Sequence, residues 1–381
     1  MNSNGRRALA ISLCVLLLLT GCATFLPQPT PIPPTPYPRT RIESPGYGLE
    51  AYLWWKPEIA TRDLGLVRDA GFSWVKQTFA WRDIEVEKGK YDWSRADDTV
   101  FLAGHFGLKL LIRLDRDPWW DRTYPDGKGI ASGPPRDLRN FTSYCSVIAA
   151  RYKGKVAAYQ VWNEPNLARE WGGNPPDPAQ YVEMLRQCYL AIKASDSAAL
   201  VISAGLAPTG NGPPDAMAHT DFLQGMYKAG AAPYFDLLGV NAPGFKAAPE
   251  TSPEEAASNP LLGGQRFFAF RGAEDMRAIM VQHGDSDKQV AILEFGWTTD
   301  PVHKDYAWFA VDETTKADYM VRAYQYAKAH WQPWIGPMIA LSLPQFDWTP
   351  DTEQYWWSVI DPSYPRTITR PAYDALKKMA K

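Results

Sequence analysis

Short apolar segments alternate along this chain with longer segments in which apolar residues recur every three or four positions. The short segments predict eight strands, at residues 48–54, 73–78, 109–114, 157–161, 200–204, 237–241, 290–293 and 339–343. The longer ones predict helices, among them 181–194, 221–229, 272–283 and 315–330. Asp177-Pro178 suits a helix start, with Asp as cap and Pro in the first turn. Apolar strands separated by helices indicate a parallel sheet that is covered on both faces.

Eight such repeats in about 340 residues predict an α/β fold, the (β/α)8 TIM barrel. A doubly wound open sheet is the alternative, but no glycine-rich phosphate-binding motif supports it. The segment 243–266, rich in Pro, Gly, Ala and Glu, is expected to be a surface insertion that shapes the cleft.

The N-terminus has the pattern of an export signal. Arg6-Arg7 precedes an apolar run from Ala8 to Leu19, which is too short to span a membrane comfortably. The following Leu19-Thr20-Gly21-Cys22 resembles the bacterial lipobox, in which the Cys is lipidated after cleavage. We therefore expect a signal peptide at residues 1–21 and a lipid anchor on Cys22, with an ordinary secretory signal as the alternative.

A proline-rich linker is expected at residues 22–43, and the barrel at 44–381. A stiff polyproline stalk after a lipidated Cys would hold the barrel away from a membrane. The expected location is thus the surface or membrane of a bacterium, with the lipid as the sole membrane contact.

Composition limits the possible partners. The net charge of −2 gives no reason to expect nucleic acid. The five His are scattered and no Cys/His cluster has metal spacing, so we expect no metal and no cofactor. The chain is expected to be a monomer. Its 16 Trp and 19 Tyr suit either a large core or stacking platforms for sugar rings.

Cys145 and Cys188 each lie on an apolar stripe of a predicted helix. Two small buried thiols are the favoured interpretation. A disulfide between neighbouring helices is the alternative, which the oxidising compartment would permit.

The hexapeptide from Val161 to Asn166, Val-Trp-Asn-Glu-Pro-Asn, carries the clearest chemistry. It follows an apolar strand, so Glu164 and Asn163 lie at the strand's C-terminal end. Glu164 could protonate a departing glycosidic oxygen, and Asn163 could hold a neighbouring sugar hydroxyl. The alternative is a turn in which Asn and Pro end the strand and the Glu is solvated.

Glu294 ends another short apolar run, 130 positions further on. In a parallel barrel the C-terminal strand ends share one face, so Glu164 and Glu294 can meet there. Glycosidases use such a carboxyl pair as acid/base and nucleophile, or as acid and base.

The same rule selects further residues. The expected cleft residues are Trp81, Arg116, Trp119, Asn163, Asn241, Trp297 and Trp348, with Lys76 inside the second strand. We expect Trp297 and Trp348 to line the sugar cleft together with Trp81 or Trp119, packing at the barrel top being the alternative for each. The charged stretch 113–117 could equally be a structural ion-pair network.

Trp-Asn-Glu-Pro-Asn on a fourth strand and a Glu ending a seventh resemble glycoside hydrolase clan A. The resemblance is nearest to the β-xylosidase/α-iduronidase type and to cellulase-like bacterial proteins. It includes the segments 81–85, 88–93 and 358–373 and covers roughly residues 46–378.

The resemblance implies a retaining hydrolase of an extracellular oligo- or polysaccharide, with Glu164 as acid/base and Glu294 as nucleophile. Lys76 stands where many members carry Arg, and Asn241 lies where many have a His and a Tyr. We expect Lys76 to support Glu294 electrostatically. A sugar-binding surface lipoprotein whose activity is lost or reduced is the alternative, and an inverting hydrolase a third possibility. The sugar, the anomer, endo or exo action, and hydrolysis or transglycosylation stay open.

Overall fold

The computed structural model describes residues 41–125 and 129–381. The expected signal peptide, Cys22 and nearly all of the proline-rich linker lie outside the described residues.

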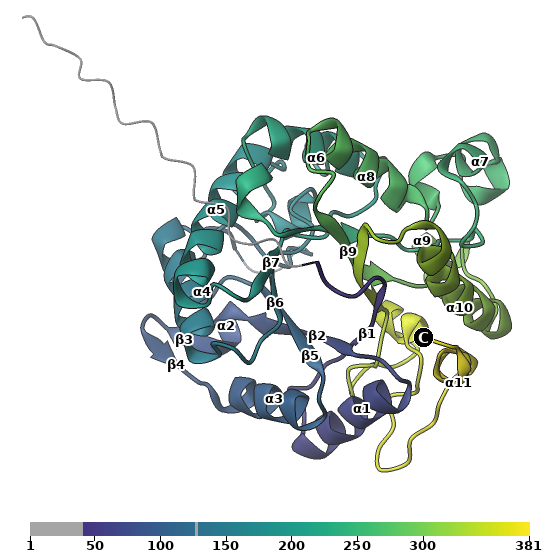
Figure 1. Ribbon diagram of the computed structural model, residues 1–381, viewed down its shortest axis with the longest axis horizontal. Helices are drawn as coiled ribbons and strands as arrows, with labels where there is room; N and C mark the ends of the chain where they lie inside the picture. The colour runs from purple at the N-terminus through teal and green to yellow at the C-terminus, as the bar shows by residue number, and fades with distance from the viewer. Residues whose placement is uncertain (1–40, 126–128) are drawn as a thin grey trace, which may run out of the picture. The chain divides into compact units, whose positions relative to one another are not determined.

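Eight parallel strands close into a barrel in the order β1-β10-β9-β8-β7-β6-β5-β2 (Figure 1). They are β1 (Gly46–Glu50), β2 (Trp74–Ala80), β5 (Lys109–Asp115), β6 (Ala158–Val161), β7 (Leu200–Ile202), β8 (Leu237–Asn241), β9 (Gln289–Phe295) and β10 (Ile335–Ala340). Two further short strands, β3 (Glu85–Glu87) and β4 (Lys90–Tyr91), form a separate antiparallel pair. The fold is therefore the predicted TIM barrel.

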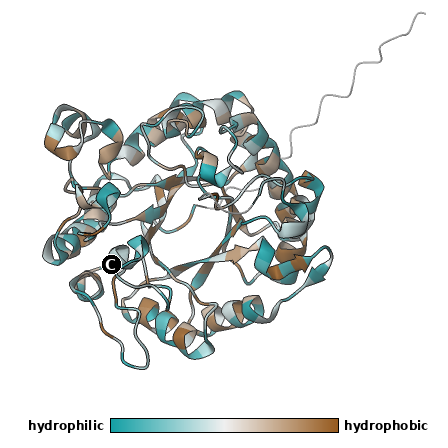
Figure 2. Ribbon diagram, turned by 180° about the vertical axis from the view of Figure 1, so that it is seen from behind, coloured by the Kyte–Doolittle hydropathy of each residue, from teal (hydrophilic) through white to brown (hydrophobic). Residues whose placement is uncertain are grey.

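Helices surround the barrel and follow its strands in the chain (Figure 1). They are α1 (Pro57–Asp69), α2 (Trp81–Ile84), α3 (Ser94–His105), α4 (Leu138–Arg151), α5 (Pro178–Ser195), α6 (His219–Lys228), α7 (Pro253–Ser258), α8 (Gly272–Gln282), α9 (Lys304–Ala307), α10 (Glu313–His330) and α11 (Pro371–Lys378). Hydrophilic residues lie on the outward faces of many of these helices (Figure 2). At the start of α5, Asp177 accepts hydrogen bonds from the amides of Ala179 and Gln180, as predicted.

Two strand predictions were misplaced. The first strand ends at Glu50 and not at residue 54, and the last begins at Ile335 and not at residue 339. In both cases apolar residues beyond the strand, such as Leu53 and Leu343, are buried in the loops that follow it. A buried loop and a buried strand look alike when only hydropathy is read.

The inward-facing positions of the barrel change character along each strand. Trp74, Leu111 and Leu237 belong to an apolar cluster of side chains from the strands. Because side chains alternate along a strand, Lys76 on β2 and Arg113 on β5 are the next inward positions toward the C-terminal end. The barrel interior is thus apolar toward the N-terminal ends of the strands and charged toward their C-terminal ends.

Cys145 on α4 and Cys188 on α5 form a disulfide, so the favoured prediction of two free thiols was wrong. Both Cys are fully buried, and hydropathy cannot distinguish a buried thiol from a buried disulfide. Within residues 41–125 and 129–381, no helix is both long and apolar enough to cross a membrane.

Candidate active site

Glu164 follows β6 in an unusual backbone conformation. Trp162 and Glu164 have φ values of 71° and 42°, in the left-handed region that non-glycine residues seldom adopt. The turn is held because the Glu164 amide donates to the carbonyl of Gly205 (3.1 Å) and the Trp162 indole donates to the carbonyl of Glu170 (3.0 Å). Strained residues of this kind cluster at functional sites, so their presence on both sides of Asn163 indicates that this turn belongs to one.

A β-bulge directs Glu294 into the barrel. Along the β8–β9 pair, Val240 is opposite Ile292 but Asn241 is opposite Glu294, so Leu293 is skipped in the register. Simple alternation would turn Leu293 inward and Glu294 outward. The extra residue lets Leu293 fill the apolar interior while Glu294 reaches the charged layer above it.

Asn241 connects the two glutamates. Its Nδ2 lies 3.1 Å from Oε1 of Glu164 and 3.5 Å from Oε2 of Glu294. These two oxygens can be no farther apart than both contacts together, about 6.6 Å. This upper limit includes the spacing of retaining pairs, about 5–5.5 Å, and only just reaches that of inverting pairs, which begins at about 6.5 Å. Gly205 makes room for the amide, since a Cβ at this position would lie 2.1 Å from Oδ1 of Asn241.

Two cations contact Glu294. Lys76 Nζ lies 2.8 Å and Arg113 Nη1 lies 3.1 Å from its Oε1. Burial alone would raise the pKa of Glu294, but the charges of Lys76 and Arg113 outweigh burial and hold this pKa below its usual range. Glu294 is thereby kept ionised, which is the state a carboxylate nucleophile needs.

A third carboxylate shares Lys76. Glu50, at the end of β1, lies 3.3 Å from Lys76 Nζ and is 3% exposed. Burial raises the pKa of Glu50; the positive charge of Lys76 opposes that rise and the negative charge of Glu294 adds to it.

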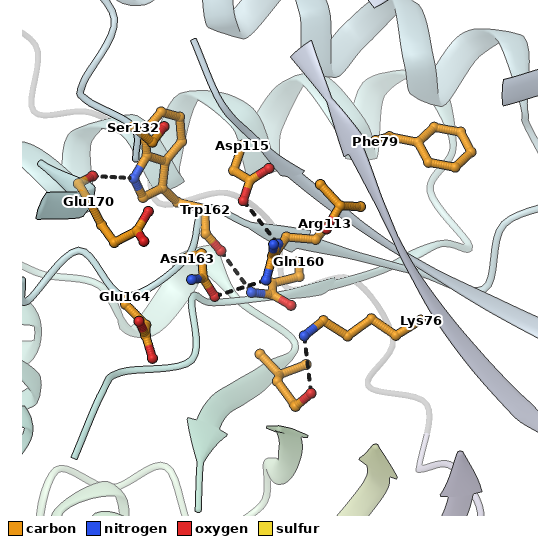
Figure 3. Close-up of polar contacts among 12 residues, drawn as sticks. Lys76, Phe79, Arg113, Asp115, Ser132, Gln160, Trp162, Asn163, Glu164 and Glu170 are labelled. Carbon is orange, nitrogen blue, oxygen red and sulfur yellow. Dashed lines mark hydrogen bonds and ion pairs between the residues drawn. The ribbon is translucent and has the colours of Figure 1, made fainter. Parts of the chain in front are cut away.

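Arg113 also organises the neighbouring loop. Its Nη1 donates to Oδ1 of Asn163 (3.3 Å), and its Nε lies 2.9 Å from Oδ2 of Asp115 (Figure 3). The charged stretch 113–117 is therefore partly an ion-pair network, as the alternative interpretation held, and that network reaches Glu294.

On the other side of the site, Arg169 donates to Oε2 of Glu164 over 2.8 Å. The side chain of Arg169 is 55% exposed, so the contact lies at the mouth of the site. Two more carboxyls stand nearby. Burial, reinforced by the charge of Glu164, raises the pKa of Glu170 to about 7, and burial raises that of Glu353 to about 7.

Both glutamates line a cavity of about 380 Å³ at the C-terminal end of the strands. The lining includes four further residues predicted from the sequence: Asn163, Arg116, Asn241 and Trp348. Lys76 lies beneath it as the buried partner of Glu294. Among residues 41–125 and 129–381, no group of His, Cys, Asp or Glu is placed to hold a metal ion.

Three predicted cleft residues lie elsewhere. Trp81 is fully buried against Trp120, Phe141 and Tyr144, and its indole donates to Glu85. Trp297 is also fully buried, and its indole donates to the carbonyl of Ala247. Trp119 is 61% exposed, lies under the guanidinium of Arg122, and does not line the catalytic cavity. A Trp that follows a strand can belong to the core, the surface or the cleft, and position in the sequence does not distinguish these.

Sequence reasoning missed four residues that shape the site: Glu50, Arg169, Tyr306 and Glu353. Glu50 ends a strand and would have met the same rule as Glu294, but the first strand was predicted to run on to residue 54. The other three lie in short helical turns within the connections after β6, β9 and β10, where neither periodicity nor spacing marks a site residue.

Residues 52–144 match the β-galactosidase family, glycoside hydrolase family 42. The chain is 30% identical over 131 residues to β-galactosidase BgaH of Haloferax lucentense, an alignment that covers 29% of this chain and 20% of that protein. The chain thus matches about a fifth of the length of this curated relative. The family match includes β2, β5 and the first half of α4, and ends before Glu164 and Glu294.

Glycoside hydrolases also share the fold. A family 39 enzyme from Bacteroides cellulosilyticus is 18% identical with a TM-score of 0.62 (88% of this chain, 64% of that one). A glucosidase from Croceicoccus marinus is 15% identical with a TM-score of 0.61 (88% and 68%). An endoglucanase from Thermotoga maritima is 14% identical with a TM-score of 0.54 (87% and 96%). The resemblance to clan A glycoside hydrolases is confirmed.

Proposed function

We propose that the protein is a retaining glycosidase in which Glu294 is the nucleophile and Glu164 the acid/base. The observation that carries this proposal is the asymmetric environment of two carboxylates joined by Asn241. Glu294 contacts two cations that keep it ionised, whereas Glu164 contacts Arg169 at the exposed edge of the cavity. Two carboxyl groups in different environments have different pKa values and can therefore take different catalytic roles.

In the first step an oxygen of Glu294 attacks the anomeric carbon, and the bond to the leaving oxygen breaks. Glu164 gives its proton to that oxygen, so the aglycone departs as an alcohol. In the second step water attacks the glycosyl–Glu294 ester. Glu164 takes a proton from this water, the sugar is released, and Glu294 regains its negative charge.

Asn241 and Arg169 contribute to this cycle through Glu164. Asn241 holds the carboxyl at a fixed place relative to Glu294 in both steps. The ion pair with Arg169 must weaken before Glu164 can carry a proton, and the exposed position of Arg169 leaves its side chain room to move aside when a glycan enters.

The first substrates to test are β-galactosides, because the family match and the curated relative are both β-galactosidases. We also propose that the substrate is an extracellular glycan and that the barrel is held at a bacterial membrane through Cys22, on the evidence of the export signal and the proline-rich linker.

The proposal is tested on aryl glycosides by NMR observation of the first product. Retention of the anomeric configuration is expected, and an inverted first product would falsify the retaining mechanism. Glu294→Gly should abolish hydrolysis, and azide should restore glycosyl transfer with inversion at the anomeric carbon. Glu164→Ala should spare substrates with good leaving groups far more than poor ones. A protein that binds glycans but cleaves no glycoside in a broad panel would instead be a sugar-binding lipoprotein.

A further inference from the structure

A second cavity, of about 530 Å³, adjoins the catalytic one. The two share Tyr52, Arg113 and Arg116 in their linings, so they are parts of one continuous cleft. The second cavity lies over the ends of β1, β2 and β5, on the side of the site away from Glu164.

The lining of this second cavity is cationic. It contains four arginines, Arg82, Arg95, Arg113 and Arg116, against one acid, Asp83, in a chain whose net charge is −2. Arg113 is committed to Asp115 and Glu294. In the described part of the chain, the side chains of Arg95 and Arg116 form no hydrogen bond and no ion pair. Cations without partners in a cleft attract a negatively charged ligand.

The backbone fixes the position of Arg116. Its φ is 63°, a left-handed conformation that costs a non-glycine residue stability, and its carbonyl accepts a hydrogen bond from the amide of Arg82 (3.0 Å). The residue stands where the two cavities meet. Arg116 thus combines a strained backbone with a guanidinium that has no hydrogen bond or ion pair among residues 41–125 and 129–381, which favours a role in ligand binding over one in stabilising the fold.

The same cavity offers a platform for a sugar ring. Trp55 is 43% exposed in the lining. Its neighbour Trp54 is held by a hydrogen bond to Thr99 and by packing on Phe79, so Trp54 is part of the wall, whereas Trp55 keeps exposed ring surface in the lining. Aromatic faces bind the C–H faces of pyranose rings.

A third cavity sets the direction of the glycan. It shares Glu164 and Arg169 with the catalytic cavity but does not include Glu294. Glu164 protonates the leaving group in the proposed mechanism, so this third cavity receives the aglycone. The arginine-lined cavity then lies on the glycone side, one residue beyond the sugar that is cleaved.

We propose that the arginine-lined cavity is a subsite for an anionic sugar residue, with the ring on Trp55 and its carboxylate or sulfate on Arg116, next to Arg82 and Arg95. The guanidinium fork pairs with both anions in a bidentate manner. This inference rests on the proposed glycosidase function for its orientation. It makes the preferred substrate an acidic glycan that is cut away from its non-reducing end, since the subsite holds a further sugar residue before the one that is cleaved.

The test is calorimetric binding to the full-length Glu294→Gln protein, which cannot cleave the ligand. The probes are tetrasaccharides with glucose, galactose or mannose backbones, each in neutral, C6-carboxylate and 6-sulfated form. At least one acidic member should bind about tenfold or more tightly than its neutral parent, as expected for hydrogen bonds to a charged group. Raising NaCl from about 0.05 M to about 0.5 M should reduce this preference by screening. The carboxylate and sulfate arms show which anion is the ligand.

Arg116→Met should lower the affinity for the acidic member far more than that for the neutral parent, and so remove most of the preference, with the melting temperature unchanged. Arg116→Lys should restore part of it. Arg366→Met, which removes the same charge from an exposed loop outside the cavity, is the matched control and should change nothing. The inference is overturned if no acidic tetrasaccharide exceeds its neutral parent, or if Arg366→Met lowers the preference as much as Arg116→Met. Cleavage of neutral aryl glycosides by the unsubstituted protein tests the glycosidase function separately.

Discussion

The ammonium group of Lys76 lies between two carboxylates, 2.8 Å from Oε1 of Glu294 and 3.3 Å from Oε1 of Glu50. The expected contact between Lys76 and Glu294 is therefore present. Nζ also donates to the carbonyl of Leu293 (3.1 Å), so all three protons of this fully buried group have an acceptor within reach. A Lys thereby supplies the charge that Arg supplies in many clan members, and Arg113 from the next strand supplies a guanidinium.

Lys76→Met should cut turnover and move the acidic limb of the kcat/KM–pH profile to higher pH. Lys76 lowers the pKa of Glu294, so the nucleophile stays ionised to lower pH when Lys76 is present. Removing the cation raises that pKa, and protonation then begins at higher pH. A pH–rate profile measures the shift, and Lys76→Arg should keep the limb in place.

Lys76→Met also leaves Glu50 buried without its cation, which costs about 3–5 kcal/mol of stability. The double variant Lys76→Met/Glu50→Gln should recover much of this stability but should keep the shifted acidic limb. If the limb instead returns with the stability, or never moves, Lys76 has only a structural role.

Asn241→Ala should lower kcat by about 100-fold, the usual loss when one fixed donor is removed from an active site. Gly205→Ala should reproduce this loss, because its Cβ would lie 2.1 Å from Oδ1 of Asn241 and must displace the amide. The double variant should be no worse than either single one, since both changes remove the same contact.

Gly212→Ala is the control for the glycine change, because a Cβ there meets nothing within 4 Å. It should leave kcat and stability unaltered. Additive losses in the Asn241/Gly205 pair would contradict a shared cause.

The fold could be predicted because its signals are local and repeated. Each barrel strand is a short apolar run, and the helices are marked by capping residues and apolar stripes. The ends of β1 and β10 could not be located, since the apolar residues that follow them are buried by tertiary packing.

The site could be predicted only in part, for a physical reason. Glu164, Glu294 and Asn241 follow from the rule that strand ends converge. The inward turn of Glu294 depends on a bulge, and the contact of Arg169 with Glu164 depends on a loop conformation. Neither leaves a periodic trace in the sequence, so the partners of the two carboxyls are visible only in three dimensions.

Cys22→Ala should move the protein from the membrane fraction to the soluble fraction, or leave it unprocessed. The physical reason is that acyl chains supply about 0.8 kcal/mol of membrane affinity per buried CH₂. Fractionation and N-terminal mass spectrometry of the mature chain measure this. A mature chain that begins at any residue other than Cys22 would contradict the anchor.

Trp297 and Trp348 should respond oppositely to truncation. Trp297 is fully buried, and the backbone at Gly244 passes so near its ring that a Cβ there would lie 1.9 Å from it. Trp297→Ala should therefore cost about 3–5 kcal/mol in the free energy of unfolding.

Trp348 lines the catalytic cavity with its ring against Tyr52 (4.8 Å between centroids). Trp348→Ala should leave denaturant unfolding nearly unchanged but raise KM, because a stacking platform for the sugar is lost. Tyr52→Leu, which removes the ring in edge-on contact with Trp348, should also raise KM. If Trp348→Ala instead lowers stability and leaves KM unchanged, its ring belongs to the barrel-top packing, as those of Trp81 and Trp297 do.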